Sequence, residues 1–113
     1  MLPKAQRLTR NKEFDFVFKG GKSHYSDFFG LKIKKNQLNL NRFGFVVSIK
    51  VSKKAVLRNR LKRQVRSVIR EENETLKQGF DCIFIFFPLI LDKKFNEIRE
   101  LIKNSFKKLN MYN

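Results

Sequence analysis

The sequence predicts an α+β protein, a two-layer α/β sandwich in which three helices pack on a four-stranded sheet. Apolar residues alternate with period two in some segments and recur with period 3.6 in others, and one later run is almost wholly apolar. The connections are short, and a chain of 113 residues buries enough surface for one core only. We therefore expect one domain over residues 1–113 with the element order αβββαβα, which excludes a large multi-domain enzyme.

The first half of the chain is predicted to form one helix and three strands. In order these are a helix at 11–19, a weak strand at 23–28 placed by its position alone, and strong strands at 29–33 and 43–49. In the helix, Phe14, Val17 and Phe18 share one face. Asn11 is the expected N-cap, and two glycines after Lys19 end the helix. The strong strands are predicted from alternating apolar residues, with an asparagine-rich turn between them.

The second half is predicted to form a helix, a central strand and a final helix. In order these cover 55 to about 76, 80–87 and 95–109. The first helix has an apolar stripe from Leu57 to Ile69 at helical spacing, and no glycine or proline interrupts it before Gly79. The run at 80–87 is apolar on both faces, which is typical of a central strand, and Pro88 ends it.

The net charge of +16 predicts a polyanionic partner, because 26 Lys and Arg stand against 10 Asp and Glu. The charge is concentrated in residues 50–70, which we call the basic segment and which contain no acid. Its nine cations are Lys50, Lys53, Lys54, Arg58, Arg60, Lys62, Arg63, Arg66 and Arg70. On a helical wheel, the six from Arg58 onward fall on the face away from the apolar stripe.

The like charges of the basic segment indicate a binding face rather than a solvated one. Solvated helix faces pair opposite charges, whereas Arg58, Lys62 and Arg66 repel at a spacing of four residues by about 0.2–0.5 kcal/mol per pair. A bound polyanion offsets this repulsion, so we expect sulfate or phosphate to stabilise the free chain. Arginine forks favour phosphate oxygens. Membrane binding would need a free apolar helix face, and the absence of a zinc finger, leucine zipper or clear helix-turn-helix favours RNA over DNA.

Few residues outside the basic segment are candidates for chemistry. Cys82 lies in the apolar run and is interpreted as a small buried hydrophobe, and the single histidine, His24, as a lone surface or strand-edge residue. No metal site is predicted. No apolar stretch approaches the ~20 residues that span a bilayer, so we expect a soluble, cytoplasmic protein with no membrane partner. No catalytic residue is predicted, although the scattered Asp15, Asp27 and Asp81 leave metal-assisted hydrolysis open.

The start of the basic helix resembles a known signature. Residues 53–66, in which Arg58-Asn59-Arg60 precedes Lys62-Arg63, resemble the bacterial ribonuclease P protein subunit. Three further features agree in order and spacing with that family. They are Arg7-Leu8 followed by a helix with Glu13-Phe14 and Val17-Phe18, a strand at 44–48 that runs into Lys50, and a single strand and helix that close the chain.

The resemblance implies a ribosomal-protein type of fold, with a left-handed βαβ crossover that leads into the basic helix. It implies a non-catalytic subunit whose partners are a catalytic RNA, which uses Mg²⁺, and precursor tRNA, from which the 5′ leader is removed. It implies no protein metal site and no obligate protein partner. Position by position, the residues expected to contact the catalytic RNA are Lys50, Lys53, Lys54, Arg58, Asn59, Arg60, Lys62, Arg63, Arg66 and Arg70. Those expected to line the leader cleft are Phe14, Phe18, Phe29 and Lys32.

Several alternatives stay open from the sequence alone. Phe14 and Phe18 could pack in the core, in which case Phe16 would be the exposed ring. Lys53-Lys54 replaces the Gly-Asn of many family members, which leaves the crossover geometry less defined. A structural ribosomal protein would share the size, charge and fold but would need no leader cleft. A DNA-binding architectural protein would instead prefer duplex DNA.

Overall fold

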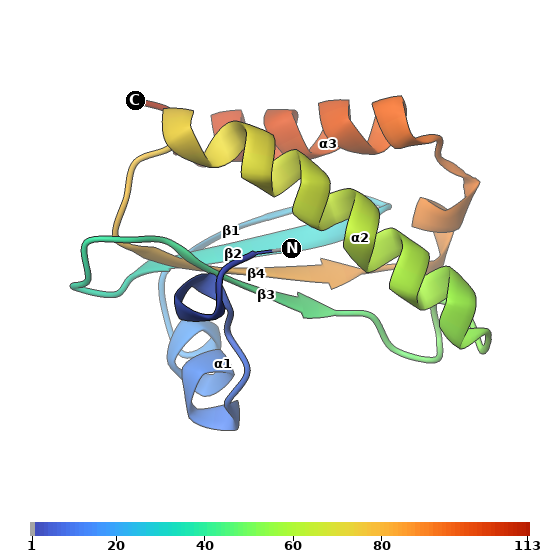
Figure 1. The fold of residues 1–113 in the computed structure, drawn as a ribbon, viewed down its shortest axis with the longest axis horizontal. Coiled ribbons are helices and arrows are strands. Elements are labelled where there is room, and N and C mark those ends of the chain that lie inside the picture. Colours follow the sequence, from blue (N-terminus) through green and yellow to red (C-terminus); the bar gives the residue numbers. More distant parts are fainter. Residues whose placement is uncertain (1) are drawn as a thin grey trace.

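The computed structural model describes residues 2–113 and confirms the predicted class and element order. Its elements are η1 (Lys4–Gln6), α1 (Asn11–Phe18), β1 (Lys22–Tyr25), β2 (Phe29–Lys35), β3 (Arg42–Val46), α2 (Ala55–Glu72), η2 (Asn73–Thr75), β4 (Phe80–Phe86), η3 (Pro88–Asp92) and α3 (Phe95–Lys108), where η marks a 3₁₀ turn. Helices α2 and α3 cover one face of the sheet, which gives the two predicted layers, and the short α1 lies against the other face (Figure 1).

The four strands form one mixed sheet in the order β1-β2-β4-β3. Strand β2 pairs antiparallel with both β1 and β4, whereas β3 pairs parallel with β4. The apolar β4 is therefore an internal strand, as its sequence predicts. Helix α2 connects the parallel neighbours β3 and β4, so it begins near the end of β3 and returns along the sheet toward the start of β4 (Figure 1). The left hand of this crossover stays a prediction.

Several element boundaries differ from the sequence prediction, and among them β1 ends at Tyr25 rather than at residue 28, while β2 extends to Lys35. Arg10 rather than Asn11 is the N-cap of α1, because the Glu13 carboxylate accepts a hydrogen bond from the Arg10 N–H at 3.0 Å. Strand β3 ends at Val46, since the apolar alternation of the sequence continues after the chain has left the sheet. Helix α2 ends at Glu72, and η2 occupies the remaining expected turn.

The sheet separates two apolar clusters. The larger one fills the space between the sheet and helices α2 and α3, with Phe84 and Phe106 fully buried in it. The smaller one lies between the sheet and α1 and contains Leu8, Val17 and Ile83. The strand period of two sends successive residues of β2 and β4 into opposite clusters. Across residues 2–113, the helices are too short or too polar for any of them to cross a membrane.

Candidate nucleic-acid interface

The basic segment forms one cationic surface on α2 and on the loop before it. On α2, Leu61 and Val65 are buried against the larger cluster, while Arg60, Arg63 and Arg70 are exposed. The ion pairs found within residues 2–113 all lie elsewhere, so no carboxylate there neutralises the basic segment. Like charges that are left unpaired on one helix face favour a polyanionic ligand.

Two arginines of the basic segment are held in place by the protein itself. The Arg58 guanidinium donates a hydrogen bond from Nη1 to the Ser52 carbonyl oxygen, at 2.7 Å. The Arg66 guanidinium lies 5.6 Å from the centre of the Phe45 ring, and its Nε is buried without a hydrogen-bond partner within the described chain. The Phe45 ring therefore restricts where the Arg66 guanidinium lies, and no carboxylate of residues 2–113 forms an ion pair with it.

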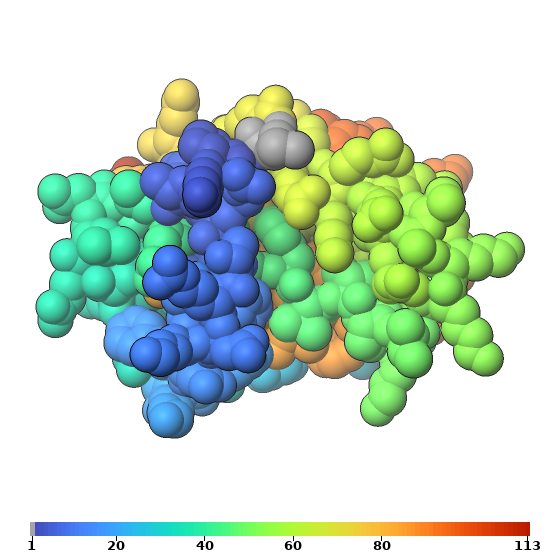
Figure 2. Space-filling view, turned by 60° about the horizontal axis from the view of Figure 1, so that its bottom comes forward, coloured from blue at the N-terminus to red at the C-terminus, as the bar shows by residue number. Residues whose placement is uncertain are grey.

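The basic segment reaches both sides of α2. On the α3 side, Arg60 lines a hollow of about 290 Å³ together with Lys93 and Lys94. On the other side, Arg66 extends toward β3 by way of Phe45. In Figure 2, the loop before α2 (green) and α2 itself (yellow-green to yellow) are separated by a hollow from α1 and the N-terminal residues (blue). A strand of nucleic acid that follows α2 could therefore contact cations along either flank of the helix.

Three of the four predicted leader-cleft residues come together beside α1. Phe14 is half-buried against the smaller cluster, and Gly44 makes room for it, because a Cβ at Gly44 would lie 2.7 Å from Phe14 Cζ. Phe18 is 41% exposed, with its ring centre 6.4 Å from that of Phe14 and 5.6 Å from Lys32 Nζ. Phe16 is also exposed, but the Lys34 ammonium covers its ring at 4.0 Å. Phe14 therefore packs in part, and Phe18 offers the more open ring.

The prediction that Phe29 lines the leader cleft is wrong. Its side chain is 1% exposed and lies in the larger cluster, with its ring centre 5.8 Å from those of Phe84 and Phe86. The reason is the period of the strand: residues 29, 31 and 33 of β2 face α2 and α3, whereas Lys32 faces α1. Phe29 and Lys32 therefore cannot line one surface.

An ion-pair cluster that the sequence reasoning missed fixes α1 to the edge of the sheet. Arg42 on β3 binds the buried Asp81 through Nε and Nη2, at 2.8 and 2.6 Å, and binds Glu13 of α1 through Nη1 at 2.6 Å. The backbone N–H of Arg10 holds the pKa of Glu13 below its usual value, with the Arg42 charge contributing. The hydrogen bonds to Asp81 raise the pKa of Arg42. Because these partners are far apart in the sequence, no local pattern indicates the cluster.

The other candidate groups are not gathered into a reactive site. Burial raises the pKa of the Cys82 thiol, which lies fully buried in the larger cluster. His24 Nδ1 is 3.4 Å from Ser105 Oγ on α3. Asp15 and Asp27 are exposed on separate segments, and in residues 2–113 no three His, Cys, Asp or Glu side chains lie close enough to hold a metal ion.

Known proteins match this chain along nearly all of its length. The family model of Ribonuclease P matches residues 2–110. The chain belongs to the ribonuclease P protein family. A relative from this family, the ribonuclease P protein component of Clostridium botulinum, is 38% identical over 111 residues, which are 97% of this chain and 99% of the relative. That of Synechocystis is 44% identical over 88 residues, or 77% of this chain and 71% of the relative.

Solved structures of the family have the same fold. The Staphylococcus aureus RNase P protein superposes with a TM-score of 0.89 at 27% identity, covering 97% of this chain and all of that one. The Thermotoga maritima RNase P protein gives a TM-score of 0.81 at 33% identity, covering 90% and 96%. Family membership places the chain in bacterial tRNA processing, as the protein component of a ribonucleoprotein endoribonuclease that also has an RNA subunit.

Proposed function

We propose that this chain binds the catalytic RNA of ribonuclease P through the basic segment and the 5′ leader of precursor tRNA beside α1. The chain supplies no catalytic group of its own, and the RNA subunit carries out the cleavage. The protein neutralises phosphate charge and increases the affinity for the substrate. The observation that carries this proposal is the basic segment. It contains nine cations, and none of them forms an ion pair with a carboxylate of residues 2–113.

The fixed arginines support docking on a structured RNA. A folded RNA presents phosphates at defined positions, and a guanidinium that is already oriented loses less side-chain entropy when it binds two oxygens. Arg58 and Arg66 are oriented in this way by Ser52 and Phe45. The more exposed cations of the segment add charge that is less dependent on geometry.

The aromatic surface beside α1 supports the binding of an unpaired leader. Bases in a single strand stack on aromatic rings whatever their identity, because every base has a π-face. Phe18 offers an exposed ring, Phe14 lies next to it, and Lys32 places an ammonium where the sugar-phosphate backbone would pass. This arrangement suits a leader of variable sequence.

Mg²⁺ is assigned in this proposal to the RNA. Mg²⁺ needs several oxygen ligands in near-octahedral geometry. The donor set of this chain does not fit that need, because the buried carboxylate of Asp81 is bound by Arg42 and by Asn36 Nδ2, the latter at 2.8 Å. No step attributed to this chain passes through the ion.

The test is the cleavage of precursor tRNA at low Mg²⁺ by the protein alone, the catalytic RNA alone, and both together. We expect cleavage only with the RNA present, and faster with both. Cleavage by the protein alone would overturn the non-catalytic assignment.

Leader binding is tested with Phe18→Ala against a matched control, Phe16→Ala. The two rings are almost equally exposed, at 41% and 40%, but only Phe18 lies beside Phe14 and Lys32. Phe18→Ala should weaken binding of substrates with long leaders by about 5- to 150-fold, as expected for one lost stacking contact. Equal losses of affinity in both variants, or an affinity that does not depend on leader length, would instead favour a structural ribosomal protein. A preference for duplex DNA over folded RNA would favour a DNA-binding architectural protein.

A further inference from the structure

A second cationic site lies at the opposite end of the sheet from the start of α2. It is a pocket of about 570 Å³ formed where β1 and β4 begin, β2 ends and α3 has just ended. Because β4 runs parallel to β3, the start of β4 and the end of β3 lie at opposite ends of the sheet. The pocket is therefore separate from the N-terminal half of the basic segment, and its volume suits a small organic ligand.

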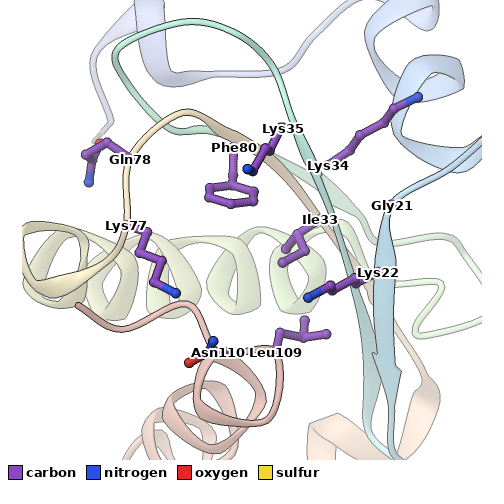
Figure 3. Close-up of a pocket in the computed structure, with 10 residues that line it drawn as sticks. All are labelled: Gly21, Lys22, Ile33, Lys34, Lys35, Lys77, Gln78, Phe80, Leu109 and Asn110. Atoms are coloured by element: carbon purple, nitrogen blue, oxygen red, sulfur yellow. The ribbon is translucent and has the colours of Figure 1, made fainter.

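Three ammonium groups surround this pocket. They belong to Lys22 on β1, Lys35 on β2 and Lys77 in the connection to β4. Figure 3 shows Lys22 and Lys77 extending toward one another across the hollow, whereas Lys34 turns away. Lys34 is engaged elsewhere, since its Nζ donates a hydrogen bond to the Phe16 carbonyl oxygen at 3.1 Å.

No carboxylate balances these lysines. The residues that line the pocket include no acid, and within residues 2–113 none of the three lysines forms an ion pair. Three like charges held around one hollow repel each other, and an anion between them would offset this repulsion. Phosphate, with several acceptor oxygens, is suited to a ring of ammonium donors.

The pocket is not only cationic. The half-buried ring of Phe80 lies beside Lys35, with Ile33 next to it and Leu109 on the opposite side (Figure 3). Amide side chains of Gln78 and Asn110 also line it. An aromatic ring beside ammonium groups is the combination that holds an unpaired nucleotide, with the base on the ring and the phosphate on the cations.

We propose that this pocket binds one unpaired nucleotide of RNA, with its phosphate on Lys22, Lys35 and Lys77 and its base against Phe80. The site would give the chain a third RNA contact, distinct from the basic segment and from the surface beside α1. This inference rests on the proposed function only in taking RNA as the source of the nucleotide.

The first experiment is a nuclear magnetic resonance titration of the free full-length chain with adenosine 5′-monophosphate. Adenosine and inorganic phosphate serve as separate probes. We expect the monophosphate to shift the backbone amides of Gly21, Gln78, Phe80 and Asn110 saturably, phosphate to do so more weakly, and adenosine to do so least. Shifts that follow the basic segment and leave these amides unchanged would overturn the proposal. No catalytic RNA is present, so the result is independent of the cleavage assay.

Matched variants identify the groups involved. Lys22→Gln with Lys77→Gln should weaken monophosphate binding about fivefold to tenfold, as expected for the loss of two partly exposed charge contacts. The control is Lys12→Gln with Lys107→Gln, which removes the same charge from exposed positions that do not line the pocket, and should change binding less than twofold. Equal weakening in both pairs would show a general effect of charge and refute the site.

A third variant separates the base from the phosphate. Phe80→Leu keeps an apolar side chain in the half-buried position but removes the ring. It should weaken monophosphate binding and leave inorganic phosphate binding unchanged, whereas unchanged monophosphate binding would refute stacking. Finally, a five-nucleotide unpaired RNA should shift the same four amides at lower concentration than the monophosphate. If the monophosphate binds and the RNA does not reach these amides, the assignment to RNA is wrong.

Discussion

Replacing Arg60 by alanine removes one cation of the basic segment without breaking any hydrogen bond or ion pair found within residues 2–113. Arg60 is exposed, so the free protein should keep its melting temperature. Arg58→Ala provides a contrast, because it also breaks the 2.7 Å hydrogen bond to the Ser52 carbonyl. That variant should lose about 1 kcal/mol of stability in addition to RNA affinity.

The size of the Arg60 effect follows from counterion release. The basic segment offers nine cations to phosphates, including the oriented Arg58 and Arg66. If all nine bind, the log-log slope of affinity against salt is about −6 to −8. Losing one contact reduces its magnitude by about 0.7–0.9, so the ratio of wild-type to variant affinity falls about threefold between 50 and 200 mM salt.

The assay is binding of the catalytic RNA to wild type, Arg60→Ala and Lys12→Ala over that salt range. Lys12 is an exposed cation of α1 outside the basic segment, and its loss should leave the slope nearly unchanged. A slope that Arg60→Ala does not alter, or that both variants alter equally, would refute the assignment of Arg60 to a phosphate. A flat salt response in the wild type would refute the electrostatic role of the whole segment.

Three further predictions concern the free protein. Phe29→Ala should cost about 3–5 kcal/mol of unfolding free energy in urea, whereas Phe18→Ala should cost about 1 kcal/mol or less; similar losses would contradict the placement of the two rings. The pKa of Glu13 is lowered on folding, so its stabilising contribution is present above the ordinary value near 4.5 and is lost as the pH falls through the folded-state pKa. Below pH 4.5 the melting temperature should therefore fall less steeply with decreasing pH in Glu13→Gln than in wild type. Identical dependence of the melting temperature on pH would argue against this linkage. Sulfate should raise the melting temperature more than chloride at equal ionic strength, and an unchanged melting temperature would count against anion binding.

Patterns that depend on nearby residues were predictable from the sequence. The apolar run at 80–87 indicated an internal strand because a strand covered on both faces has no polar side, and β4 is internal in the sheet. The stripe from Leu57 to Ile69 indicated which face of α2 is buried. The spacing of three residues between Phe29 and Lys32 places the two side chains on opposite faces of any regular strand, so the sequence itself excludes Phe29 from the face that carries Lys32.

Features that join distant segments were not predictable in this way. Arg42 meets Glu13 and Asp81 across 29 and 39 residues, and nothing local indicates such a pairing. The lysine pocket is assembled from separate segments, and only the sheet order brings Lys22 and Lys77 to one place. A single sequence carries the composition of such sites, whereas their geometry comes from the tertiary fold.

The separation of the two apolar clusters has a consequence for the thermodynamics of α1. This helix is held by the smaller cluster, by Arg42 bound to Glu13, and by Lys34 bound to the Phe16 carbonyl, and none of these contacts belongs to the larger core. Its amides should therefore exchange with solvent through local opening, at a lower free energy than global unfolding. An RNA leader bound beside α1 must suppress that opening. The affinity for the leader and the protection of the α1 amides from hydrogen exchange should therefore change together. Conditions that loosen the helix, such as protonation of Glu13, should weaken leader binding while the sheet and α2 stay folded.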